Sequence, residues 1–178
     1  MMNDEFYDNH ENIREAWHQQ LTQDDSYRSG LRFARRLRLA RIVGLAALFI
    51  PLASVLVSQF LSGVWWLLLV GWVFVWPHLA WQLAFRSAEP NSSEIVNLKI
   101  DAIIAGVWMG LTGCSALPTA ALIMMIGMNM MGSGGCRLFL TGLALLALSA
   151  LLTVQSTGTP VLLTSEPLAL WLTLPVLV

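Results

Sequence analysis

Charged residues are scarce in this sequence. They make up 12% of its 178 residues, whereas a soluble domain has roughly 25%. No Asp, Glu, Lys or Arg occurs in three long runs, residues 42–85, 102–136 and 138–165. A helix that crosses a membrane needs about 20 apolar residues, and these runs are longer. They exclude a soluble enzyme, a disordered chain and a disulfide scaffold, and they indicate an integral membrane protein.

Motifs that carry chemistry are also absent. The sequence has no GxxxxGK[ST] phosphate loop, no GxSxG elbow and no HExxH helix. Its two cysteines, Cys114 and Cys136, are predicted near opposite membrane faces, and a disulfide needs Cα atoms within about 7 Å. We therefore expect no catalytic residue, no cofactor and no metal site in this chain.

The charges that are present divide the N-terminal part into two segments. Residues 1–27 hold seven acidic side chains against Arg14 alone, and they predict a flexible cytoplasmic head. Residues 28–41 predict a basic membrane-proximal helix, because each cation near a bilayer surface is attracted to anionic headgroups by about 1 kcal/mol. Because the segment adjoins an apolar run, nucleic acid is not an expected partner. Its expected lipid-facing side chains are Arg28, Arg32, Arg35, Arg36, Arg38 and Arg41.

Breaks in the apolar runs divide residues 42–178 into membrane spans. Five spans are expected near 41–59, 64–85, 98–113, 118–132 and 137–154. Leu168–Val178 begins a sixth, but its helix would rise only about 17 Å, against a hydrocarbon core of about 30 Å. We therefore expect an all-α membrane helix bundle of about six transmembrane helices, the sixth incomplete, in a fragment of a longer protein.

The positions of the basic residues predict the orientation. All ten Lys and Arg residues lie on, or at the border of, the segments that share the side of the N-terminus, and the opposite loops hold none. By the positive-inside rule, the N-terminus of this multi-pass protein is expected to be cytoplasmic.

Two polar residues are expected in the same leaflet. His78 follows Pro77 in the second span, and Asp101 lies near the start of the third. An ionised group inside a membrane costs about 2.5–3.5 kcal/mol, so such residues usually find partners. A His78–Asp101 pair is a candidate proton sensor. The alternative is an ordinary polar contact between helices.

Trp72 and Trp76 are four residues apart and share a helix face. They are candidates for lining a pocket for an apolar small-molecule signal, with helix packing as the alternative. Ala102, Gly106 and Gly110 form a stripe of small residues that allows close helix contact. That contact is either within the bundle or in a homodimer.

Four strings make the sequence resemble a known family. They are RSGLRFARRLRLARIVGLA, VGWVFVWPHLAWQLA, NLKIDAIIAGVWMG and NMMGSGG, spread in order through residues 28–178. They resemble the second type of MASE domain, a membrane-associated sensor domain of AdrA-like GGDEF diguanylate cyclases.

The resemblance implies an inner-membrane input module followed by a cytoplasmic GGDEF domain. That domain is expected after residue 178 and absent here, so this chain is not expected to be an enzyme. GTP and Mg²⁺ belong to the missing domain, which makes cyclic di-GMP as a dimer. The resemblance also implies control of cellulose production and biofilm. The alternatives are a small transporter or transporter subunit, and a truncated membrane anchor without a signalling role.

Overall fold

The computed structural model of the protein describes residues 2–58 and 63–159, and every regular element in that part of the chain is helical. This confirms the all-α prediction. The sixth, incomplete span expected at Leu168–Val178 lies outside the described residues. The elements are α1 (Met2–Ser58), α2 (Gly63–Val70), the π-helix η1 (Gly71–Val75), α3 (Trp76–Arg86), α4 (Pro90–Leu111) and α5 (Ala116–Thr157).

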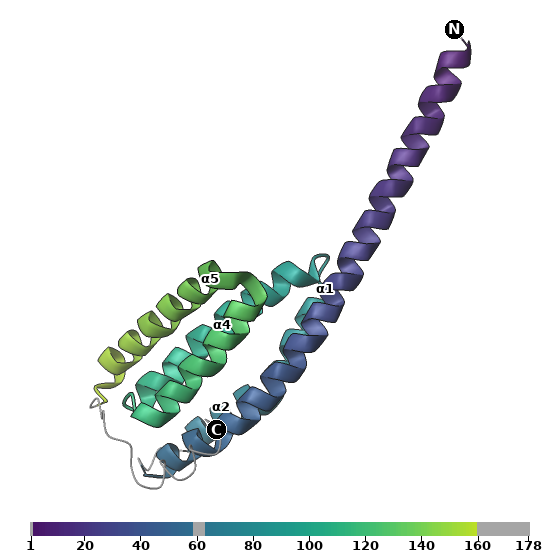
Figure 1. Cartoon of the computed structure of the whole chain (residues 1–178). Helices are drawn as coiled ribbons and strands as arrows, with labels where there is room; N and C mark the ends of the chain where they lie inside the picture. Colours follow the sequence, from purple (N-terminus) through teal and green to yellow (C-terminus); the bar gives the residue numbers. More distant parts are fainter. Residues whose placement is uncertain (1, 59–62, 160–178) are drawn as a thin grey trace.

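Helix α1 is the longest element, and its N-terminal part extends beyond the other helices (Figure 1). Its 57 residues correspond to a rod of about 86 Å. The acidic head, expected as a flexible segment, therefore has a helical backbone. Asp24 and Arg28 form an exposed ion pair of 3.2 Å one turn apart, which favours the helix. The mobility of the head stays a prediction.

Helices α2, η1 and α3 follow each other without a break between Gly63 and Arg86. The π-helical stretch lies just before Pro77, which is at the start of α3. Proline has no N–H, and its ring collides with the carbonyl four residues earlier in a regular helix. A π-bulge is one of the known ways in which a helix accommodates such an irregularity.

Helix α5 contains a sharp reversal at Gly135. This residue has φ +66° and ψ −161°, a conformation that only glycine adopts easily. Two helical stretches therefore run in opposite directions on either side of it, as Figure 1 shows. They correspond to the predicted fourth and fifth spans.

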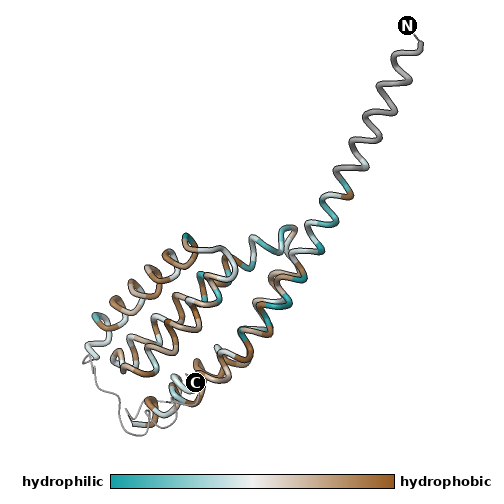
Figure 2. The backbone as a smooth tube through the Cα atoms, in the orientation of Figure 1, coloured by the Kyte–Doolittle hydropathy of each residue, from teal (hydrophilic) through white to brown (hydrophobic). Residues whose placement is uncertain are grey.

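The bundle is apolar along most of its length (Figure 2). By length and composition, three of the described helices are able to cross a membrane: Gln20–Ser58, Gly63–Arg86 and Ala116–Thr157. Helix α4 carries Glu94, Lys99 and Asp101 and is not among them, although it covers the predicted third span. The core includes Leu45, Leu48 and Leu52 of α1 packed with residues of the other helices.

Candidate functional site

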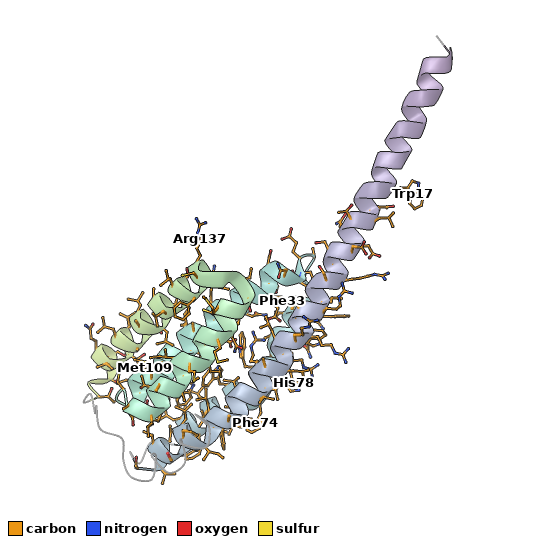
Figure 3. The ribbon with its side chains drawn as sticks, viewed as in Figure 1. Trp17, Phe33, Phe74, His78, Met109 and Arg137 are labelled. Carbon is orange, nitrogen blue, oxygen red and sulfur yellow. The ribbon has the colours of Figure 1, made fainter. Side chains whose placement is uncertain are left out.

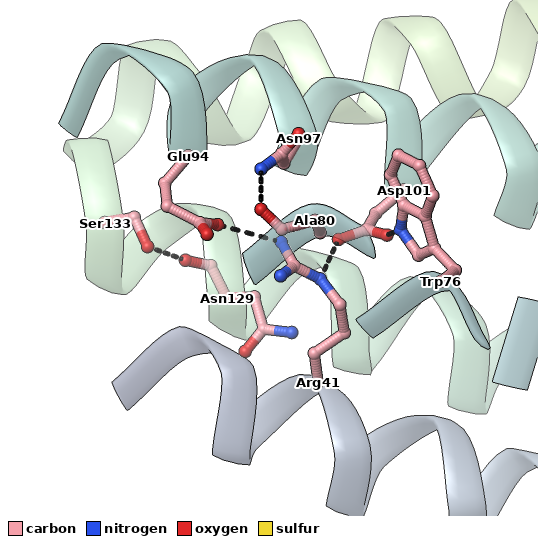
Figure 4. Close-up of polar contacts among 8 residues, drawn as sticks. All are labelled: Arg41, Trp76, Ala80, Glu94, Asn97, Asp101, Asn129 and Ser133. Atoms are coloured by element: carbon pink, nitrogen blue, oxygen red, sulfur yellow. Dashed lines mark hydrogen bonds and ion pairs between the residues drawn. The ribbon is translucent and has the colours of Figure 1, made fainter. Parts of the chain in front are cut away.

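Three charged side chains are buried together between α1 and α4. Arg41 Nε donates to Asp101 Oδ2 at 2.7 Å, and Arg41 Nη2 donates to Glu94 Oε2 at 3.2 Å. Arg41 is 1% exposed, Glu94 0% and Asp101 2%. Figure 4 shows the guanidinium of Arg41 between the two carboxylates. We call Arg41, Glu94 and Asp101 the charge cluster.

Helix α3 also contributes a side chain to the charge cluster. Trp76 of α3 donates its Nε1–H to the second carboxylate oxygen of Asp101, at 2.5 Å. Asn97 of α4 donates from Nδ2 to the backbone carbonyl of Ala80, at 3.0 Å, which ties α4 to α3 a turn away (Figure 4). The polar contacts of the charge cluster therefore join α1, α3 and α4.

Helical spacing explains why these side chains meet. Glu94, Asn97 and Asp101 are separated by three and four residues, so they lie along one face of α4. On α1, Arg41 falls in the same row as four buried apolar residues, which are Ala34, Leu37, Leu45 and Leu48. The core-facing side of α1 thus carries one cation, opposite the acidic side of α4.

The three buried charges link α1 to α4 and depend on one another. Removing one member of a buried ion pair leaves an uncompensated charge, which typically costs about 3–5 kcal/mol. Two atoms of the cluster, Arg41 Nη1 and Glu94 Oε1, are buried without a hydrogen-bond partner in the described part of the protein. Both carboxylate oxygens of Asp101 therefore accept a hydrogen bond, whereas Glu94 accepts the one from Arg41 through Oε2 only.

The predicted His78–Asp101 pair does not form. His78 is on an exposed face of α3, and its Nδ1 lies 3.1 Å from the carbonyl of Phe74 on its own helix (Figure 3). Asp101 is bonded to Arg41 and Trp76 instead. His78 and Trp76 point in different directions from α3, and Trp76 has the inward position, where it reaches Asp101.

The prediction that Arg41 faces lipid is also wrong, because Arg41 is in the core face of α1. Arg38 is half-buried, and its guanidinium carbon lies 5.7 Å from the ring centre of Trp81, a cation–π contact. The other members of the basic segment are exposed, as the prediction requires: Arg28, Arg32, Arg35 and Arg36.

An apolar hollow of about 520 Å³ lies beside the charge cluster, between α2–α3 and α4. Trp72 and Trp76 both line it, as expected of pocket residues. Trp72 is stacked on Trp108 of α4, with ring centres 6.2 Å apart, and Trp65 meets Trp108 edge-on at 6.4 Å. We call this hollow the tryptophan groove; its other lining residues are Leu67, Leu68, Gly71, Val75, Leu79, Ile104, Val107 and Leu111.

The small-residue stripe packs within the chain. A Cβ added to Gly106 would collide with the side chain of Ser149 and the carbonyl of Leu146, and one added to Gly110 would lie 2.8 Å from the carbonyl of Ala150. All three partners are in the second half of α5. Ala102, one turn before Gly106, is fully buried. The stripe is therefore a seam between α4 and α5, which was the first of the two alternatives.

The described residues offer no metal centre: no group of three or more His, Cys, Asp or Glu side chains is placed to hold an ion. Cys114 and Cys136 are both free, as expected.

Sequence reasoning missed Glu94 and Asn97, which fell in a predicted loop. The signal that identifies them is their helical spacing from Asp101. The signal for Arg41 is its place in the row of buried leucines on α1.

Comparisons with known proteins add a family likeness. The MASE2 domain family matches residues 36–124, a range that includes the charge cluster and the tryptophan groove. Two relatives are named probable diguanylate cyclase DgcC, one from Escherichia coli strain K12 and one from Escherichia coli O6:H1 strain CFT073. Each is 54% identical over 156 residues, which cover 88% of this chain and 42% of the relative. The chain thus spans less than half the length of these relatives. No solved structure shows a match.

Proposed function

The chain belongs to the MASE2 domain family, and on this premise we propose that it is the membrane sensory input module of a protein that makes cyclic di-GMP. The observation that carries the proposal is the family match over residues 36–124, together with 54% identity to proteins named probable diguanylate cyclases. Synthesis from GTP with Mg²⁺ is assigned to a GGDEF domain outside these 178 residues. Cellulose production and biofilm formation are the processes that the proposal places under its control.

The charge cluster is the proposed point at which a signal acts on the bundle. A ligand changes an output only if it has different affinities for two arrangements of the protein. Helices that are held by ion pairs change between discrete arrangements, because such contacts are either made or broken. The Arg41 contacts to Glu94 and Asp101 fix α1 against α4, so a signal that moves one helix relative to the other has to alter them.

The proposed location is a bacterial inner membrane with the N-terminus in the cytoplasm. The exposed arginines of α1 and Arg137 at the Gly135 reversal support it, because they lie toward one end of the bundle (Figure 3). In this orientation Arg28, Arg32, Arg35 and Arg36 contact anionic headgroups. Homodimerisation is proposed for the full-length protein, since two copies are needed to condense two GTP molecules.

A transporter receives less support from the described residues. The buried hydroxyls of Ser54 and Ser149 are hydrogen-bonded to carbonyls of their own helices. These hydroxyl groups therefore do not extend the charge cluster into a polar path.

The experiment that tests the proposal measures cyclic di-GMP in cells that express the full-length protein from its native gene. Arg41→Lys keeps the positive charge but loses the planar fork that reaches two carboxylates. At equal abundance in the membrane, we expect this variant to change the cyclic di-GMP level several-fold. Arg35→Lys, at an exposed position of the same helix, is the matched control and should leave the level unchanged.

Two results would contradict the proposal. One is that the wild-type full-length protein raises cyclic di-GMP no further than an empty vector. The other is that Arg41→Lys and Arg35→Lys give the same level as the wild type, in which case the charge cluster has no role in the output.

A further inference from the structure

The charge cluster contains one cation and two carboxyl groups, so its charges do not balance. With Arg41 protonated and both Glu94 and Asp101 ionised, the cluster would carry one excess negative charge inside the bundle. The three side chains are at most 2% exposed, and an uncompensated ion is very costly in such surroundings. A buried acid avoids this cost by keeping its proton, which makes it neutral.

Neighbouring charges do not cancel this excess. In the described part of the protein, the charged groups that act on Glu94 are Arg41 of α1 and Asp101 of its own helix. Arg38 of α1 lies over a tryptophan ring of α3 instead, and His78 is on the exposed face of α3. The labelled side chains that α3 and α5 place around the cluster are uncharged: Trp76, Asn129 and Ser133 (Figure 4).

The hydrogen bonds of the two carboxyl groups differ in length and number. Asp101 accepts from Arg41 Nε at 2.7 Å and from Trp76 Nε1 at 2.5 Å, one donor to each oxygen. Arg41 Nη2 donates to Glu94 Oε2 at 3.2 Å, and Oε1 has no hydrogen-bond partner among the described residues. Bonds between two ionised groups are typically about 2.7–2.9 Å long, whereas neutral acceptors extend to about 3.2 Å. These contacts fit an ionised Asp101 and a neutral Glu94.

Glu94 is also nearer than Asp101 to the exposed end of α4. The helix begins at Pro90, so Glu94 lies about 6 Å along its axis and Asp101 about 17 Å. Ala88 and Glu89, just before the helix, are exposed. A proton therefore has a shorter way from water to Glu94 than to Asp101. In the proposed orientation, that water is cytoplasmic.

We infer that Glu94 is a proton-binding site, with the proton on Oε1, and that Asp101 is the ionised partner of Arg41. The protonated cluster is neutral, and Arg41 Nη2 then donates to the carbonyl oxygen of the Glu94 acid. Release of the proton to water leaves an unbalanced negative charge between α1 and α4, so this arrangement of the two helices becomes less stable. The inference rests on the proposed function for the role of the charge cluster, and it names the proton as the signal that acts there.

Infrared spectroscopy of the purified full-length protein tests the inference, in a maltoside detergent that has no ester carbonyl. A protonated carboxylic acid has a C=O stretching band that a carboxylate lacks. At neutral pH the wild type should show a band that Glu94→Gln loses, and the band should shrink as the pH rises. Glu89→Gln is the matched control: Glu89 is exposed just before α4, and its replacement should leave the band unchanged.

Thermal unfolding of the same preparations gives a second measurement. The folded state holds a proton that the unfolded chain releases at neutral pH, so wild-type stability should fall as the pH rises. Glu94→Gln should remove this part of the pH dependence and unfold near the wild-type temperature at neutral pH. Asp101→Asn removes the ionised partner of Arg41 and should unfold at a clearly lower temperature.

The output is measured separately, as cyclic di-GMP made from GTP and Mg²⁺ by membranes that contain the full-length protein. The ratio of wild-type to Glu94→Gln product should change several-fold between mildly acidic and mildly alkaline pH. A constant ratio overturns the role of the proton as the signal. Absence of product from every variant contradicts the proposed function, and the infrared band still decides whether Glu94 binds a proton.

Two further results would overturn the proton-binding site. One is that Glu94→Gln keeps the infrared band, or lowers the unfolding temperature as much as Asp101→Asn, because Glu94 is then an ionised partner of Arg41. The other is that sodium ions at constant pH raise the unfolding temperature of the wild type but not of Glu94→Gln, which would make a metal cation the occupant.

Discussion

The charge cluster and the tryptophan groove are neighbouring regions that differ in how far their side chains are exposed at the surface of the bundle. In the cluster, Arg41, Glu94 and Asp101 are at most 2% exposed, and five of their seven side-chain nitrogen and oxygen atoms are paired within the chain. In the groove, Leu67 and Leu68 stay more than half exposed. Lipid solvates leucine well but not an ion, so only the polar region has to be closed by the protein itself. Trp76 belongs to both regions, with its N–H in one and its ring in the other.

The largest effect is expected from breaking the charge cluster. Arg41→Ala leaves two carboxylates buried without their cation, and we expect it to destabilise the bundle by about 3–5 kcal/mol. Arg35→Ala removes an exposed arginine of the same helix and should change stability by no more than about 0.5 kcal/mol. Thermal unfolding of the purified protein in detergent measures both, and equal unfolding temperatures would contradict the prediction.

A second variant separates charge imbalance from lost packing. Replacing all three members by uncharged residues, as Arg41→Met, Glu94→Gln and Asp101→Asn together, removes the unpaired charges. This triple variant should recover much of the stability that Arg41→Ala loses.

The next largest effect is expected from disturbing the close packing of α4, which contributes residues to both regions, against α5. Gly106 lies on α4 between Asp101 and Leu111, and a methyl group there collides with the carbonyl of Leu146. We expect Gly106→Ala to cost about 3 kcal/mol, at the upper end of the range for overpacking. Gly132→Ala is the control, because nothing lies within 4 Å of its added Cβ. If the two substitutions are equally tolerated in thermal unfolding, α4 and α5 do not pack as closely as the structure shows.

A smaller effect is expected from separating the two functions of Trp76. Trp76→Phe keeps an aromatic ring in the groove and removes the hydrogen bond to Asp101, which should cost about 1.5 kcal/mol because the acceptor is charged. Trp72→Phe is matched to it, since Trp72 Nε1 has no hydrogen-bond partner among the described residues. Unfolding in detergent compares the two, and a cost for Trp72→Phe as large as that for Trp76→Phe would assign the effect to ring size.

The last prediction concerns topology and not stability: it tests which side of the membrane each end of the bundle faces. Cys136 is exposed near the end with the charge cluster, and Cys114 is at the end with the groove. In intact cells, a membrane-impermeant maleimide should label Cys114 and reach Cys136 only after permeabilisation. Burial raises the pKa of the Cys114 thiol, which lowers its thiolate fraction at neutral pH, so its labelling should be slow and should accelerate as the pH rises. Labelling of Cys136 in intact cells would reverse the proposed topology.

How far the site was predictable depends on the residue. Trp72 and Trp76 were correctly predicted to share a helix face and to line one pocket, because residues four apart in a helix lie on the same face whatever surrounds them. The choice between His78 and Trp76 as the partner of Asp101 was not predictable from a shared leaflet, since it depends on the rotation of a helix that contains a π-bulge before Pro77. Arg41 was misassigned because five other arginines precede it within residues 28–41, and it was grouped with them by composition although its position continues the buried row of α1.

The sequence alone determined that this protein is a helical membrane bundle, and where most of its helices lie. Apolar runs of this length have no other stable arrangement in lipid, because only a helix satisfies its backbone hydrogen bonds within one segment. The tertiary structure decided which charges meet. A salt bridge between residues 60 apart, Arg41 and Asp101, depends on how α1 and α4 are rotated and placed against each other, and no local pattern contains that information.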